Sequence, residues 1–299
     1  WTLFAPMLKL LYQRLHAYLA SEMDRAKVQR YEPYSYETNA TQFRWLTLAL
    51  IAWVLVSLTV AWQDRTTANY LSELQDQGMR TAPPTQISVQ RDVDQILKFA
   101  EREGIACTSQ REIVELLPEC VRLMDIQDEY SLVKDQGSMF VVLLIVVLLA
   151  NIFAFGAFTH RASRNLLTLK SEKQGFSPEK AVIWFFIPVL NMIKPWQVFK
   201  ELFKGSDPDV TTSDQSAWKT KGKIPKIVHV WAAIFVAVFI FNPRTIGWFW
   251  YPVRESIDDV LVAHQRLVIA DILLAVLGIA AILVVKELHK WQEARYAKV

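Results

Sequence analysis

Residues 184–203 read WFFIPVLNMIKPWQVFKELF, a stretch apolar enough to enter a membrane. Pro188 and Pro195 each remove a backbone donor and break helix geometry, and Lys194 at mid-bilayer costs about 3 kcal/mol or more. Irregular backbone at membrane depth persists only where protein or water covers it. We therefore expect a re-entrant or interfacial helical hairpin at about 181–203 that does not cross the membrane. The alternative is a kinked fifth span.

Three other stretches are strong candidates for membrane spans: 43–62, 139–158 and 267–285. Each has about 20 residues, the length that an α-helix needs to cross roughly 30 Å of hydrocarbon. A fourth stretch, 227–241, is shorter and becomes long enough only with its flanking apolar residues. Because 52% of the 299 residues are hydrophobic and charge sits in blocks between these stretches, the sequence predicts an all-α integral membrane protein with four transmembrane helices.

The charged blocks predict the topology. Residues 63–138 contain 8 Lys/Arg and 14 Asp/Glu, whereas residues 159–226 contain 12 Lys/Arg and 6 Asp/Glu. Positively charged flanks stay in the cytoplasm. We therefore expect residues 1–42, residues 159–226 and the tail 286–299 inside, and the loops 63–138 and 242–266 outside. An even number of crossings keeps every basic block inside, which is a second reason why 184–203 should not cross.

The first 42 residues are predicted to form an amphipathic segment in the cytoplasm or at the membrane interface. Apolar residues at 4, 8, 11, 15 and 19 make a helical stripe opposite a basic polar face. Such a helix lies on the membrane surface or docks on a partner. The alternative is that it packs against loops of its own chain.

The 63–138 loop is expected to be a small helical extracytoplasmic domain. Residues 88–103 have helical apolar spacing, and Ser109 with Glu112 forms a capping box for a second helix. The loop contains both cysteines of the chain, Cys107 and Cys120, which favours a disulfide in an extracytoplasmic setting. A helix unbroken to Cys120 would hold the two about 15 Å apart, unless Pro118 breaks it. Two buried free thiols are the alternative.

Known enzyme motifs are absent from the sequence, so no catalytic residue, cofactor or metal site is predicted. There is no glycine-rich phosphate loop, HExxH, CxxC pair or GxSxG. The five histidines pair with no other histidine or cysteine at ligand spacing. A net charge of only +3, with its basic residues beside the spans, argues against a nucleic-acid partner.

Three polar residues are predicted at or near membrane depth. Asp271 lies within the last span, about one turn from its outer end. It either reaches the outer surface or faces the other helices as part of an ion path. Asn151 lies deeper and is expected to bond a neighbouring helix rather than a substrate. His229 lies near the inner end of the third span, within reach of the 181–203 block.

The cytoplasmic block combines basic and aromatic residues. The aromatic residues are Trp184, Phe185, Phe186 and Trp196, and the basic residues around them are Arg161, Arg164, Lys170, Lys173, Lys194, Lys200 and Lys204. This combination suits anionic lipid headgroups or a small anion. The alternative is the ordinary positive-inside anchor. Asn191 lies between the prolines, where it is suited to bond the backbone groups that they free; ligand contact is its alternative role.

The same block carries a family resemblance. The stretches RASRNLLTL at 161–169, GFSPEKAVIWFFIPVLNMIKPWQVFKELF at 175–203 and VVKELHKWQEAR at 284–295 resemble a bacterial membrane-protein family catalogued as domain of unknown function 4328. The resemblance covers about 43–295 and implies a four-helix membrane protein without a known activity. Its matching positions are Arg161, Asn165, Leu166, Phe176, Ser177, Pro178, Trp184, Phe186, Pro188, Asn191, Pro195, Gln197, Glu201 and Gln292.

Taken together, these features predict a non-enzymatic protein of the bacterial cytoplasmic membrane with both termini inside. We expect an accessory or scaffolding subunit of a larger membrane complex, in contact with the lipid bilayer and with other subunits. One alternative is a small transporter or channel that uses Asp271 and the broken 184–203 block. Another is a membrane sensor whose extracytoplasmic domain detects a signal.

Overall fold

The computed structural model describes residues 35–84, 93–105, 107, 118–171, 173–187, 190–210, 217–243 and 256–298. The chain divides into two compact units, Trp1–Glu37 and Thr38–Val299, and nearly all described residues belong to the second. The expected amphipathic helix in 1–42 lies, up to residue 34, outside the described residues. The expected capping box at Ser109 and Glu112 lies outside them as well.

The described part of the chain is helical, with no strand. Its elements are α2 (Ala40–Asp76), α3 (Val93–Glu103), α5 (Pro118–Thr168), α6 (Pro178–Ile183), the 3-10 helix η1 (Leu190–Met192), α7 (Lys194–Gly205), α8 (Trp218–Lys221), α9 (Lys226–Phe241) and α10 (Ile257–Tyr296). One isolated bridge pairs Thr81 with Ser256. The predicted all-α class is confirmed.

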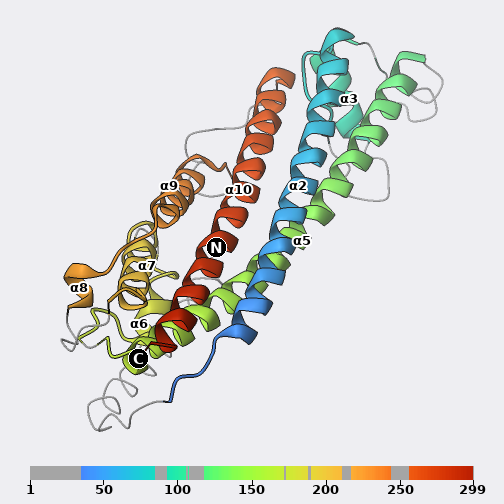
Figure 1. Ribbon diagram of the computed structural model, residues 1–299. Coiled ribbons are helices and arrows are strands. Elements are labelled where there is room, and N and C mark those ends of the chain that lie inside the picture. Colours follow the sequence, from blue (N-terminus) through green and yellow to red (C-terminus); the bar gives the residue numbers. More distant parts are fainter. Residues whose placement is uncertain are drawn as a thin grey trace, which may run out of the picture. The chain divides into compact units, whose positions relative to one another are not determined.

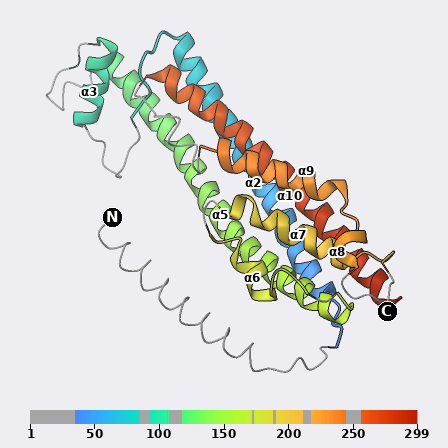
Figure 2. The same cartoon turned by 90° about the vertical axis from the view of Figure 1, so that its left-hand side faces the viewer.

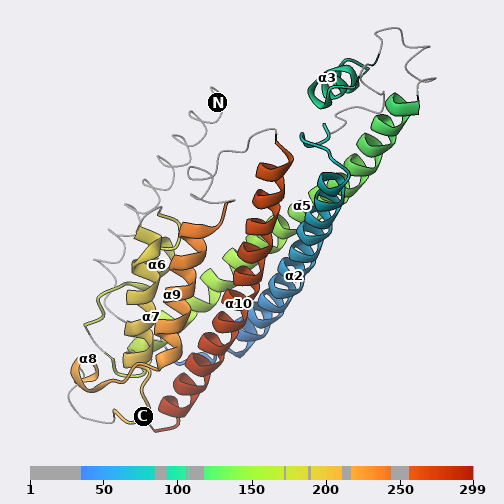
Figure 3. The same ribbon diagram turned by 90° about the horizontal axis from the view of Figure 1, so that it is seen from above.

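Three helices, α2, α5 and α10, are long and apolar enough to cross a membrane. They contain the expected spans 43–62, 139–158 and 267–285. α2 packs on both of the others, and it runs beside α10 in Figures 1 and 3. α9 covers the expected span 227–241 but has only 16 residues, and it packs against α10 and α7.

These long helices continue well past the expected spans. α2 runs on to Asp76, because no glycine or proline interrupts it before Gly78, which has a φ of +89°. α5 begins at Pro118, a residue suited to the first helical turn, and continues to Thr168. The expected extracytoplasmic domain is therefore built on the extended ends of two spans, with α3 packed beside the start of α5 (Figure 2).

α2 and α10 are antiparallel, and contacts along their length define their register. The indole Nε1 of Trp53 donates to the carbonyl of Leu274 at 3.1 Å. Asp64 contacts His264 at 2.9 Å, and beyond it the amide of Ile257 donates to the carbonyl of Arg80 at 3.0 Å. At the opposite end, Asn39 bonds the side chain of Gln292. We call this end the Gln292 end and the other the disulfide end.

Two exposed tryptophans of α2 lie about one membrane thickness apart. Trp45 and Trp62 are 66% and 65% exposed, and the residues exposed between them on the same helix are apolar. At 1.5 Å per residue the two lie about 26 Å apart along the axis, close to the thickness of a hydrocarbon core. Tryptophan is enriched at both membrane interfaces, so Trp45 and Trp62 are suited to the two boundaries of the hydrocarbon core.

Gly278 of α10 lies at a close contact between α10 and α2. A Cβ atom built on it would lie 2.8 Å from Cγ2 of Val54 and 2.9 Å from Cδ1 of Trp53. Gly278→Leu should therefore force the helices apart and lower the free energy of unfolding by roughly 1–3 kcal/mol or more. Val276→Leu, on a 40% exposed position of the same helix, is the matched control. Thermal unfolding of the detergent-solubilised protein measures both; equal midpoints would contradict the close approach.

Candidate functional site

Gln292 connects four segments at the Gln292 end. Its side chain is fully buried, and its Nε2 donates to the carbonyl of Ala162 in α5 at 2.8 Å and to Oγ of Ser206 after α7 at 3.2 Å. Its Oε1 accepts from Nδ2 of Asn39 at 3.0 Å. All three polar groups of the amide are thus used, and α2, α5, α7 and α10 are held together by one side chain.

Two neighbours on α10 extend this network. Nδ1 of His289 bonds Oδ1 of Asn39, and burial lowers the pKa of the His289 imidazole. Arg295, only 4% exposed, donates to the carbonyls of Leu169 at 3.2 Å and Asp207 at 3.1 Å. Burial lowers the pKa of this guanidinium, while the charge of Asp207 opposes that shift. We call Asn39, Ser206, His289, Gln292 and Arg295 the joint.

The motif residues Asn165 and Leu166 pack beside the joint. Both are buried. A Cβ atom on Gly205 would lie 2.9 Å from Cδ2 of Leu166, so only a glycine permits this approach of α7 to α5. The hydroxyl of Ser171 then donates to the carbonyl of Gly205 at 2.8 Å. Arg161 and Arg164, from the same motif, lie half-buried on α5.

Glu201 of α7 positions the chain that leads into α6. Its Oε1 accepts from the backbone amides of Gly175 at 2.9 Å and Phe176 at 3.3 Å. Burial raises the pKa of the Glu201 carboxyl, and the two amide hydrogen bonds oppose this. Ser177 then caps α6 by accepting from the amide of Lys180. The motif residues Phe176, Ser177, Pro178 and Glu201 therefore form one local structure.

The turn between α6 and α7 contains the remaining motif residues. Nδ2 of Asn191 donates to the carbonyl of Phe185 at 3.2 Å, so this amide satisfies a backbone group of the turn. Nζ of Lys194 donates to Oε1 of Gln197 at 3.1 Å and lies 5.2 Å from the ring centroid of Trp184. Pro188 lies outside the described residues, and Pro195 is buried in the first turn of α7.

An aromatic cluster anchors this block to the long helices. Phe155 of α5 lies 5.4 Å from Phe185, 5.5 Å from Phe199 and 6.2 Å from Trp231 of α9, measured between ring centroids. The indole of Trp196 in α7 donates to Nδ1 of His229 in α9 at 3.2 Å. His229 therefore contacts the block that its position in the sequence had placed within reach.

Asp271 lies in the interface between α2 and α10. Its side chain is 0% exposed, so the alternative in which it reaches the outer surface is wrong. The contacts Trp53–Leu274 and Asp64–His264 bracket its position. Because Asp271 lies about one turn from Leu274, this register places it opposite Ser57, which is also 0% exposed.

Asn151 makes a helix–helix contact. Its Nδ2 donates at 2.9 Å to the carbonyl of Ala49 in α2 and at 2.9 Å to that of Val147 in its own helix. Interhelical bonds of this kind stabilise helix pairs in membranes by about 0.6–2 kcal/mol. The residue thus fixes the level of α5 against α2, with Phe155 one turn further on at the level of Trp45.

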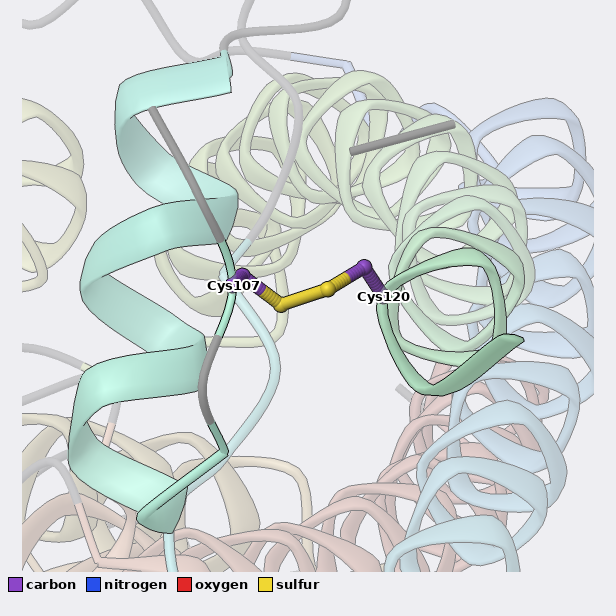
Figure 4. The surroundings of a disulfide bond; sticks show 2 residues. All are labelled: Cys107 and Cys120. Carbon is purple, nitrogen blue, oxygen red and sulfur yellow. A yellow bond between two sulfur atoms is a disulfide. The ribbon is translucent and has the colours of Figure 1, made fainter. Parts of the chain in front are cut away.

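Cys107 and Cys120 form a disulfide at the disulfide end (Figure 4). It joins the segment after α3 to the first turn of α5, with Cα atoms 6.1 Å apart. Cys120 is fully buried beside Ile96 and Met124. The bond therefore holds α3 against α5, and its closeness to Pro118 agrees with a helix that starts there.

The joint contains residues that sequence reasoning missed. Asn39, Ser206, His289 and Arg295 lie in ordinary-looking polar stretches, and only Gln292 belongs to the recognised motif. These residues lie just beyond the ends of the spans. Polar residues that become buried there must form hydrogen bonds, so their positions could have indicated such a network. Among the described residues, no group of three or more His, Cys, Asp or Glu side chains is arranged to hold a metal ion.

Comparison with known proteins gives one family. Residues 127–290 match the model described as Domain of unknown function (DUF4328), which is more than half of the chain. The match includes α6, the turn, α7 and α9, and it ends just before Gln292. No curated protein and no solved structure matches the chain. The family drawn from the sequence is confirmed, over residues 127–290 rather than the expected 43–295.

Replacing Gln292 tests the joint. Gln292→Leu keeps the volume but leaves buried groups of Asn39 and Ala162 without their partner, which should cost about 1–3 kcal/mol for each group left unbonded. We expect a clearly lower thermal midpoint in detergent and faster proteolysis between α7 and α9. Gln265→Leu, at an exposed position of α10, is the control and should change neither. An unchanged midpoint for Gln292→Leu would show that the joint does not stabilise the fold.

Proposed function

The chain belongs to the family described as Domain of unknown function (DUF4328), and we propose that it is a non-enzymatic accessory or scaffolding subunit of a larger membrane complex. Three helices long and apolar enough to cross a membrane support the membrane setting. The bacterial cytoplasmic membrane is proposed from the family resemblance and from the charge distribution.

The proposed topology has four spans, with α9 as the third in chain order. α9 is entirely apolar after His229 except for its end caps, and Val238 packs in the cluster of Trp53 and Leu274 near mid-membrane. An even number of crossings puts both termini on the same side of the membrane, and the positive charge of residues 159–226 favours the cytoplasm for that side. The acidic disulfide end then faces outward, where a disulfide is stable.

We propose that α6, the turn and α7 form a re-entrant or interfacial hairpin. The start of α6 lies near His160, since Glu179 contacts that residue at 3.7 Å. Val182 then packs on Gly156 of α5, about one turn deeper. The turn that follows carries exposed apolar side chains at Phe186, Leu190 and Ile193, and α7 returns to the joint at Ser206. This path supports entry from the cytoplasmic side without crossing.

The subunit proposal rests on one observation, the bare surface of α5. Of the apolar segment of α5, 6% is buried inside the chain, against 28% for α2 and 50% for α10. Val142, Val146, Leu149 and Phe153 are 50–75% exposed along one stripe. Helix association in membranes is driven by packing. A spanning helix that is tied to its own chain along one side offers such a surface to an apolar helix of another subunit.

The partner is best found by purification from native membranes in a mild detergent, followed by mass spectrometry. We expect a second membrane protein at near-equal stoichiometry. Val146→Trp on α5 should disrupt the packing and release it, whereas Ile279→Trp, at a 50% exposed position of α10, should leave it bound. A chain that elutes without any stoichiometric partner, or equal retention in both variants, would reject the proposed role of α5.

Transport is the second candidate function, and the burial of Asp271 favours it. A carboxylate at the centre of a membrane costs roughly 2.5–3.5 kcal/mol, and the buried Asp271 lies within its span and faces α2 rather than lipid. If a cation or proton passes along the α2–α10 interface at Asp271, the wild-type protein should dissipate an ion gradient across proteoliposomes, and Asp271→Asn should abolish this. Asp258→Asn, an exposed position on the same helix, should retain it. If vesicles with the wild-type protein lose the gradient no faster than protein-free vesicles, this candidate function is rejected.

A further inference from the structure

The surface between α7 and α9 carries a hydrogen bond that fixes the orientation of a histidine. Nε1 of Trp196 donates to Nδ1 of His229 at 3.2 Å, and the two rings meet edge to face with centroids 5.9 Å apart. An indole nitrogen is a donor only. Because Nδ1 accepts this bond, the ring hydrogen of His229 lies on Nε2. His229 is exposed, so its Nε2–H is available to an acceptor outside the protein.

Two lysines lie one turn from this bond. Nζ of Lys200 lies 4.1 Å from the ring centroid of Trp196, a cation–π contact that holds the ammonium at the surface. Lys226 is exposed in the first turn of α9. α7 and α9 run in opposite directions here, so the register of the Trp196–His229 bond brings Lys200 and Lys226 to the same level.

Neither α7 nor α9 supplies a carboxylate that neutralises Lys200, His229 and Lys226. α9 contains no acidic residue. The one acidic residue of α7 is Glu201, whose Oε1 is occupied by the amides of Gly175 and Phe176. Lys200, His229 and Lys226 therefore present three donors and at least two positive charges to the same small region, a combination that suits one anion with several oxygens.

Packing contacts indicate how deep Lys200, His229 and Lys226 lie relative to the membrane. Trp231 stacks on Phe155, which lies at the level of Trp45 and hence at the membrane boundary. His229 and Lys226 precede Trp231 by about 3 Å and 8 Å along α9. This is the headgroup layer, which extends about 5–8 Å beyond the hydrocarbon on each side. Toward the membrane, Ile193 and Val230 are 53% and 50% exposed and offer an apolar surface.

We propose that Lys200, His229 and Lys226 hold the phosphate of an anionic phospholipid, with the ring of Trp196 as the platform that orients Lys200 and His229. The apolar side chains of Ile193 and Val230 then lie against the first part of an acyl chain. This neighbouring apolar surface favours a lipid over a soluble phosphate, which would gain nothing from it. The site does not depend on a protein partner and stands independently of the subunit role.

Lipid binding to the full chain in detergent micelles tests this, with phosphatidylglycerol and phosphatidylcholine as probes and native mass spectrometry as the readout. We expect a retained phosphatidylglycerol adduct and much weaker retention of phosphatidylcholine. A lysine near an anionic surface contributes about a fivefold gain in affinity. Lys200→Ala and Lys226→Ala should thus each weaken binding by about fivefold, and the double variant should weaken it more than either single variant.

Two further variants separate a built site from general attraction. Trp196→Phe keeps the ring under Lys200 but removes the donor to His229, so it should weaken the adduct while thermal stability and elution stay unchanged. Lys286→Ala, at an exposed position of α10 near the same boundary, should leave the adduct intact. Equal binding of both lipids, or equal loss in Lys286→Ala, would overturn the proposal. Displacement of the lipid by inorganic phosphate alone would also overturn it, by assigning the site to a soluble anion.

Discussion

The side-chain amide of Gln292 is the interaction on which the arrangement of the Gln292 end depends. A buried amide must have its donors and its acceptor bonded, and here the partners come from the start of α2, from α5 and from the end of α7. Helices in lipid gain little from hydrophobic attraction to one another, so polar contacts at their ends carry more of the specificity. The joint supplies that specificity where the apolar surfaces alone do not.

The same end explains how a block with two prolines is held beside the spans. Prolines free backbone groups. Asn191 bonds a backbone carbonyl of the turn, and Glu201 bonds a backbone amide just before α6. The ammonium of Lys194 is covered by Trp184 and bonded to Gln197, which lowers the cost of a charge near the membrane boundary. The motif is thus largely a set of local compensations that permit irregular backbone to lie against the aromatic cluster of Phe155.

Much of this architecture follows from the sequence, and the exceptions have physical reasons. The three long spans were predictable because 20 apolar residues have few other stable solutions in water or lipid. Their extensions to Asp76 and from Pro118 were missed because polar helices carry no hydropathy signal, only an absence of breakers. The joint was missed because Asn39 and Gln292 are 253 positions apart, and their meeting depends on the register of α2 against α10. The position of Asp271 within its helix follows from the sequence, but the direction that its side chain faces depends on that register.

The three spans differ in how much of their surface packs inside the chain, and this difference bears on the proposed subunit role. α10 and α2 are joined along their whole length, by the joint at one end and by Asp64 with His264 at the other. α5 packs on α2 and bonds it through Asn151 and near Gln63, and between Val142 and Phe153 it exposes an apolar stripe. A partner that binds this stripe would touch neither the joint nor the α2–α10 interface. The chain can therefore associate with another membrane helix without rearranging its own core, which is the property that a scaffolding subunit needs.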